Sequence, residues 1–113
     1  MNKVRVGLVG CGFAGAYHVE CLRRAYGVDV EIAGVTSLRA DRRERFGREH
    51  GIPVFDSVEA MLDAIDVLDV CSPPYVHEAS MLAAAERGKA IICEKPLTGY
   101  FGPPDADEAY RGD

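Results

Sequence analysis

Several signals that would assign a function class are absent from this 113-residue sequence. Its four cysteines form no Cys-x-x-Cys pair, which argues against a metal site and favours buried free thiols in a reducing cytosol. No apolar run approaches the roughly 20 residues of a membrane span, and no secretory signal pattern is visible. The 13 basic and 18 acidic residues give a net charge of −5, which argues against a nucleic-acid surface. We therefore expect a cytoplasmic globular protein that binds no metal, membrane or nucleic acid.

The segment Val4–Gly15 organises the rest of the chain. A short apolar run ends in a Gly-x-Gly-x-x-Gly pattern, Gly10-Cys11-Gly12-Phe13-Ala14-Gly15. Gly10 permits a tight turn, Gly12 lets the backbone approach a pyrophosphate, and Gly15 lets the following helix pack close to the strand. N–H groups at the start of that helix attract phosphate. A plain strand-to-helix turn is the alternative, but the strand before and the helix after favour dinucleotide binding.

Hydrophobic periodicity predicts strands that alternate with helices. The predicted strands are 4–9, 30–36, 67–71 and 90–93, with a short additional strand at 53–55. The predicted helices are 13–26, 41–50, 56–64 and 75–87. We expect the first helix to bury one face, formed by Ala14, Tyr17 or His18, Cys21, Leu22 and Ala25. Asp56 with Glu59 is expected to form a capping box.

This alternation predicts right-handed β-α-β crossovers and a parallel sheet. The expected fold is therefore α/β, a Rossmann-type doubly wound sheet formed by residues 1–101. Glycine, proline and acidic residues dominate the remainder, so residues 102–113 are predicted to be a linker or a disordered tail. Loops that leave the carboxyl ends of parallel strands gather at one edge of the sheet, where ligands bind.

The loop after the second predicted strand bears on the choice of cofactor. An NAD-binding domain usually has an acid here, which accepts hydrogen bonds from the adenosine ribose. This chain instead has Thr36-Ser37-Leu38-Arg39. Ser37 can donate a hydrogen bond to a 2′-phosphate, and Arg39, Arg42 or Arg43 can pair with it. The sequence thus favours NADP over NAD, unless these arginines merely solvate an exposed helix.

The loop after Cys71 follows a buried strand, where the nicotinamide half of a cofactor would lie. Ser72 is followed by Pro73 and Pro74, whose rigid backbone carries no N–H donor and can hold a shape against a flat ring. His77 stands near the next helix start. Its neutral imidazole can hold the loop in place, or the residue merely starts the helix; we do not expect it to be the catalytic base.

The last predicted strand ends in Glu94-Lys95. An ammonium at this position can hydrogen-bond a substrate hydroxyl and stabilise negative charge as hydride leaves carbon, so Lys95 is the predicted catalytic residue. Glu94 can steady Lys95 or the cofactor ribose. A surface ion pair between the two side chains is the alternative interpretation.

Three ordered motifs resemble the glucose–fructose oxidoreductase, inositol dehydrogenase and MocA (Gfo/Idh/MocA) family over about residues 3–101. The glycine pattern at 10–15 matches its dinucleotide fingerprint, and residues 71–77 resemble its Thr-Pro-Asn-x-x-His loop with Tyr75 in place of the usual Asn. Residues 94–96 match its Glu-Lys-Pro motif. The resemblance implies an NAD(P)-dependent oxidoreductase acting on sugars, polyols or related compounds. It also implies that Lys95 contacts both substrate and nicotinamide ribose, whereas Ser37 departs from the family's usual Asp.

The resemblance further implies a second α/β domain that this sequence does not contain. We therefore expect a sheet that is incomplete at its C-terminal edge and a chain that binds cofactor without turnover. The unpaired edge beside Ile91 predicts self-association, and so a homo-oligomer. Two other functions stay open: a non-catalytic dinucleotide sensor, and an interaction domain that keeps the fold without a cofactor.

Overall fold

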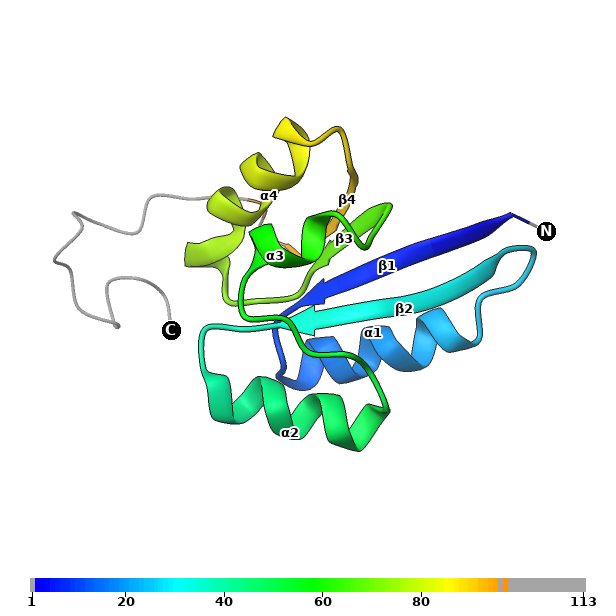
Figure 1. The fold of residues 1–113 in the computed structure, drawn as a ribbon, viewed down its shortest axis with the longest axis horizontal. Helices are drawn as coiled ribbons and strands as arrows, with labels where there is room; N and C mark the ends of the chain where they lie inside the picture. Colours follow the sequence, from blue (N-terminus) through cyan, green and yellow to red (C-terminus); the bar gives the residue numbers. More distant parts are fainter. Residues whose placement is uncertain (1, 96, 98–113) are drawn as a thin grey trace, which may run out of the picture.

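The computed structural model describes residues 2–95 and residue 97, and its centre is a four-stranded parallel sheet (Figure 1). The strands are β1 (Lys3–Val9), β2 (Asp29–Thr36), β3 (Val67–Val70) and β4 (Ala90–Cys93), in the order β2-β1-β3-β4. The chain runs outward from β1 to β2 and then returns across β1 to β3. The strand order therefore reverses between β1 and β3, which is the switch point where open α/β sheets bind ligands.

Helices cover both faces of this sheet (Figure 1). They are α1 (Phe13–Arg23), α2 (Ala40–His50), α3 (Val58–Leu62), the 3₁₀ turn η1 (Pro74–Val76) and α4 (His77–Glu86). Figure 1 shows α1 and α2 on one face and α3 and α4 on the other. The predicted Rossmann-type parallel sheet is confirmed.

Two hydrophobic cores fill the spaces between the sheet and its helices. The α1-side core contains Leu8, Val19, Val35, Phe46, Ile52 and Cys71. The α4-side core contains Val9, Met61, Leu62, Ile65, Leu68, Val70 and Ala84. Successive strand residues point to opposite faces, so β1 and β3 are buried on both sides, as central parallel strands usually are.

The same alternation places one acid inside the molecule. Leu68 and Val70 belong to the α4-side core, so Asp69 between them points toward α1. Asp69 is only 1% exposed, and it pairs in register with Leu8 of β1 and Ile92 of β4. A charged side chain therefore lies within the α1 face of the sheet.

The first helix differs from its prediction. It ends at Arg23 rather than at residue 26, and its buried residues are Gly15 and Val19, which lie four residues apart on one face. Cys21 and Ala25 are exposed, so both were wrongly assigned to the buried face. The exposed Cys21 also corrects the expectation of uniformly buried thiols, although all four cysteines are free. The face was misassigned because Gly15 has no side chain to mark it as apolar.

Other boundaries shift by a few residues. Ser57, rather than Asp56, caps α3, since its Oγ accepts a hydrogen bond from the Ala60 N–H at 3.1 Å. The predicted strand at 53–55 is a single parallel bridge between Val54 and Val35. The predicted helix 75–87 is divided into η1 and α4, and β3 ends one residue earlier than expected. The predicted domain limit at residue 101 and the tail 102–113 lie outside the described residues.

Strand β4 is the last strand of the sheet in the part of the chain that the structure describes. Ala90, Ile91 and Ile92 are all exposed, and β4 pairs only with β3 among the described strands. A polar residue would be the usual choice at such an edge. Within the same described part, none of the helices has the length and apolar character needed to cross a membrane.

The close approach of α1 to the turn after β1 can be tested by substitution. A Cβ at Gly15 would lie 2.5 Å from the carbonyl oxygen of Gly10, which is backbone and cannot rotate away. We expect Gly15→Ala to lower the free energy of unfolding by on the order of 1–3 kcal/mol, because overpacking outweighs the gain in helix propensity of about 1 kcal/mol.

Gly12→Ala is the matched control for chemical denaturation. A Cβ at Gly12 meets nothing within 4 Å, so Gly12→Ala should lower the free energy of unfolding only by the cost of alanine at a helix N-cap, at most about 1 kcal/mol. Equal losses in the two variants would contradict this packing argument.

Candidate functional site

A cavity of about 640 Å³ lies at the carboxyl end of the sheet, beside the switch point. Its walls come from the turn after β1, the loops after β2 and β3, and the start of α3. The predicted site residues that line it are Gly10, Gly12, Phe13, Ala14, Ser37, Arg39, Ser72 and Pro73. A cavity of this size is typical of small-molecule and cofactor sites.

The turn after β1 forms the floor of the cavity. Gly10 has a φ of +113°, and a Cβ there would lie 2.7 Å from the backbone N of Ser72. Gly12 is the N-cap of α1 and leaves open space where a Cβ would stand. The first helical N–H groups consequently face an unobstructed surface, with the positive end of the helix dipole behind them. A phosphate-bearing group fits this arrangement.

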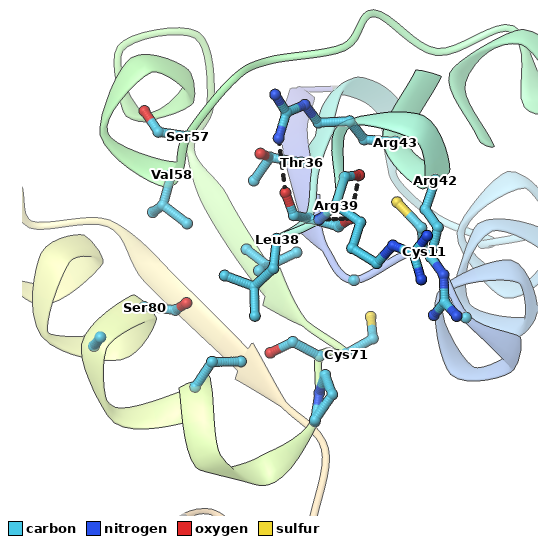
Figure 2. A pocket seen from close by; sticks show the side chains of 18 of the residues that line it. Cys11, Thr36, Leu38, Arg39, Arg42, Arg43, Ser57, Val58, Cys71 and Ser80 are labelled. Atoms are coloured by element: carbon cyan, nitrogen blue, oxygen red, sulfur yellow. Dashed lines mark hydrogen bonds between the residues drawn. The ribbon is translucent and has the colours of Figure 1, made fainter. Parts of the chain in front are cut away.

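The loop after β2 brings arginines to one side of the cavity. Figure 2 shows Arg39, Arg42 and Arg43 together there, with Val58 and Ser80 across from them. Arg43 Nη1 donates to the Ser37 carbonyl oxygen at 3.0 Å, and its buried Nε has no hydrogen-bond partner among the described residues. The cavity therefore has a cationic wall.

Acidic side chains already pair with two of these arginines. Arg39 Nη2 lies 3.0 Å from Asp41 Oδ2, and this hydrogen bond lowers the pKa of Asp41. Arg43 Nη2 lies 3.6 Å from Asp56 Oδ1, although Asp56 is largely exposed. An anionic ligand that binds Arg39 or Arg43 would therefore replace the carboxylate that now pairs with that arginine.

The loop after β3 supplies a buried hydroxyl. Ser72 lines the cavity and is 8% exposed, and its Oγ has no hydrogen-bond partner among the described residues. A buried hydroxyl without a partner is costly, so a ligand group that bonds it would bind favourably. Besides the turn at Gly12, Ser72 Oγ is a group in the cavity that can hydrogen-bond a polar ligand.

His77 contacts the loop after β3 on the side away from the cavity. Its Nε2–H donates to the Ser72 carbonyl oxygen at 2.7 Å, and its Nδ1 lies 3.3 Å from Cys93 Sγ. The ring is 1% exposed at the start of α4 and does not line the cavity. Pro74 begins η1, and it also lies outside the cavity lining. These two residues shape the loop rather than form its surface.

The last predicted site residues lie apart from the cavity. Glu94 continues the β4 pairing through its N–H, which donates to the Val70 carbonyl oxygen at 3.0 Å. Its carboxylate lies 2.5 Å from His18 Nε2 rather than beside the cavity. Lys95 is exposed and does not line the cavity. Gly15 does not line it either, because it packs against the Gly10 carbonyl group. The structure brings the first three loops together around the cavity, whereas the residues after β4 do not line it.

Sequence reasoning missed the connection between α1 and β3. His18 Nδ1 lies 2.8 Å from Asp69 Oδ2 across 51 residues of sequence. The available signal was an acid inside the apolar stretch 67–70, where a solvent-facing charge is not expected. The predicted helix face included His18 only as an alternative to Tyr17, which is 62% exposed.

Comparison with known proteins identifies relatives of this chain. The family described as "Oxidoreductase family, NAD-binding Rossmann fold" (GFO_IDH_MocA) matches residues 4–111. An inositol 2-dehydrogenase of Cereibacter sphaeroides is 35% identical over 96 residues, which is 83% of this chain and 28% of that protein. The chain therefore spans somewhat less than a third of the length of this relative.

Solved structures with the same arrangement include bound cofactors. A levoglucosan dehydrogenase in complex with NADH and L-sorbose is 28% identical, with a TM-score of 0.80 over 87% of this chain and 29% of that one. A biliverdin reductase from Synechocystis in complex with biliverdin and NADP⁺ is 26% identical, with a TM-score of 0.74 over 84% of this chain and 30% of that one. In these two proteins the same fold binds NADH in one case and NADP⁺ in the other.

Ser72→Ala tests whether the buried hydroxyl contacts a nucleotide. We expect NADPH affinity, measured by calorimetry, to fall roughly fivefold, which corresponds to about 1 kcal/mol for one lost hydrogen bond. The free energy of unfolding without nucleotide should not fall, because the hydroxyl has no partner to lose among the described residues. An unchanged affinity would show that Ser72 Oγ does not contact the nucleotide.

Proposed function

This chain belongs to the Gfo/Idh/MocA oxidoreductase family, and we propose that it is the nucleotide-binding part of an NAD(P)-dependent oxidoreductase acting on a sugar, polyol or related compound. The observation that carries this proposal is the open glycine turn at Gly12, which starts α1 at the floor of a 640 Å³ cavity. Inositol, levoglucosan and glucose-6-phosphate dehydrogenases among the relatives support the substrate class.

The walls of the cavity suggest how the dinucleotide lies. We propose that its pyrophosphate rests on the turn at Gly12, against the N–H groups of α1. The adenosine end then lies beside Ser37 and Arg39, and the nicotinamide end beside Ser72 and Pro73. This placement uses the loops after β1, β2 and β3, all of which line the same cavity.

Lys95 is the residue that we propose for catalysis. Its ammonium stands at the exposed end of β4, where it can donate a hydrogen bond to a substrate hydroxyl and stabilise the negative charge that develops on oxygen. The bound nicotinamide supplies the hydride acceptor or donor. Because the chain spans less than a third of its relatives' length, we propose that the proton acceptor lies outside it. The 113-residue chain would then bind cofactor without turnover.

We further propose that NADP is preferred to NAD. Ser37 occupies the position of the usual ribose-binding acid, so a 2′-phosphate meets no carboxylate there. The guanidinium groups of Arg39, Arg42 and Arg43 line the adjacent wall and can pair with a phosphate. A cytoplasmic location stays a prediction, since it rests on the cysteine pattern and on the sequence's lack of a secretory signal or a membrane-length apolar run.

Calorimetry with NADPH and NADH tests this preference. We expect tighter binding of NADPH, and we expect Arg39→Ala to weaken NADPH binding by on the order of tenfold, which is about 1.4 kcal/mol for a partly exposed charged contact. NADH affinity should be unchanged, because NADH has no 2′-phosphate. Arg48→Ala, outside the cavity lining, is the matched control.

Each other outcome of the titration has a definite meaning. Tighter binding of NADH would overturn the NADP preference while leaving the dinucleotide site intact. Unchanged NADPH affinity in Arg39→Ala would mean that other groups hold the phosphate. No heat with either nucleotide at millimolar concentration would favour an interaction domain that keeps the fold.

We propose that the exposed edge of β4 mediates self-association into a homo-oligomer. Ile91 and Ile92 are 37% and 44% exposed on this strand, and an unpaired apolar edge is a template for pairing with another chain. Sedimentation should show a concentration-dependent dimer or larger species, and Ile92→Lys should shift it to monomer. Tyr26→Lys, a substitution at a fully exposed residue after α1, should leave the association unchanged. A clean monomer of the unaltered chain would contradict the proposal.

A further inference from the structure

His18 connects a buried carboxylate to the end of β4. Its Nδ1 lies 2.9 and 2.8 Å from the two carboxylate oxygens of Asp69, and its Nε2 lies 2.5 Å from Glu94 Oε1. The His18 side chain is 16% exposed, while those of Asp69 and Glu94 are 1% and 45% exposed. We call these three residues the His18 bridge. It joins α1, β3 and the segment that leads into Lys95.

The geometry fits a protonated ring. With both carboxyl groups ionised, each oxygen can only accept, so both ring nitrogens donate, and only the imidazolium has two N–H groups. The buried Asp69 also needs a positive partner, because an unpaired buried charge is costly. Burial lowers the pKa of His18, but the hydrogen bonds and charges of Asp69 and Glu94 outweigh it and raise the pKa above its usual value.

Among the described residues, the thiols of Cys71 and Cys93 interact with the carboxylates of the bridge. Cys71 Sγ lies 3.6 Å from Asp69 Oδ1, and burial together with Asp69 raises the pKa of Cys71 far above its usual range. Burial and then Glu94 raise the pKa of Cys93. Both thiols therefore stay neutral when His18 titrates, and Cys71 donates to the same carboxylate as His18.

Loss of the ring proton must release one partner. A neutral imidazole keeps a single N–H, which can bond either Asp69 or Glu94. Asp69 is buried and has no access to water, whereas Glu94 can be solvated where it stands, so the proton stays on Nδ1. The bare Nε2 lone pair then faces the Glu94 carboxylate and repels it.

We propose that His18 is a positioning residue, which in its protonated form holds Glu94 and the adjoining Lys95 against α1 and in its neutral form releases them. Helix α1 also begins at the phosphate-binding turn, so a single rigid element carries both the nucleotide contact and the bridge. The proposal rests on the proposed function only in assigning Lys95 a role at the nicotinamide. The protonation state and the contact itself need no nucleotide.

Nitrogen NMR of the 113-residue chain without nucleotide tests the bridge directly. The ring should titrate with a midpoint above the value of about 6.5 for free histidine, and both ring nitrogens should be protonated on the acid side of that midpoint. The backbone amide signal of Lys95 should shift with the same midpoint as the ring. Glu94→Gln should abolish this coupled shift, because an amide in place of the carboxylate no longer responds to the ring charge.

The pH dependence of the free energy of unfolding tests the raised pKa of His18 independently. His18→Asn removes the positive charge and should lower the free energy of unfolding most at pH values below about 6.5, where the bridge is fully formed. A group whose pKa is raised on folding loses its contribution as the pH rises through the folded-state value. The difference between the two proteins should therefore shrink on the alkaline side. His50→Asn, which alters α2 instead, should leave the Lys95 titration unchanged.

Three results would overturn the proposal. The first is a His18 ring whose titration midpoint lies at or below the value of about 6.5 for free histidine. The second is a Lys95 signal that does not follow the ring, or that still titrates in His18→Asn. The third is stoichiometric uptake of Zn²⁺ that is lost in Asp69→Asn, since the ligand atoms of His18, Asp69 and Cys71 lie within 4.8 Å of one another and a metal ion would then replace the proton. A failure of NADPH to bind would leave all three measurements interpretable.

Discussion

Backbone-to-backbone contact at Gly10 is the constraint on which the site depends. Its N–H donates to the Thr36 carbonyl oxygen at 2.9 Å, and the place of its missing Cβ is filled by the chain between Cys71 and Ser72. The carboxyl ends of β1, β2 and β3 therefore converge on a residue with no side chain. Gly15 extends this approach by letting α1 rest on the Gly10 carbonyl oxygen. The cavity forms because the loops after β1, β2 and β3 all begin beside Gly10.

The parts of the structure that follow local rules were accessible from the sequence. The apolar strands and the loops that follow them predicted cavity walls at Gly12, Ser37 and Ser72, because the loops after parallel strands lie at one edge of the sheet. Gly51 also ends α2 in the left-handed conformation, as a glycine after a helix commonly does. Local signals sufficed where a residue's role depends on its neighbours in sequence.

The parts that depend on distant contacts were not accessible. The buried face of α1 is defined by Gly15 and Val19, and a glycine packed on backbone carries no hydrophobic signal. The pairing of His18 with Asp69 joins residues that no periodicity relates. Asp56 and Ser57 are adjacent candidates for the same cap, and only the hydrogen bond to Ala60 distinguishes them. Sequence patterns located the elements but not the side chains that meet between them.

The pre-formed ion pairs on the cationic wall have a consequence for how the site responds to its solvent. Because Arg39 is already paired with Asp41, and Arg43 with Asp56, an arriving phosphate exchanges one anion for another. The net electrostatic gain of that exchange is small, and part of what mobile salt would screen in the complex is already screened in the empty site. Discrimination between the two dinucleotides is then governed by the geometry of the guanidinium groups more than by their number.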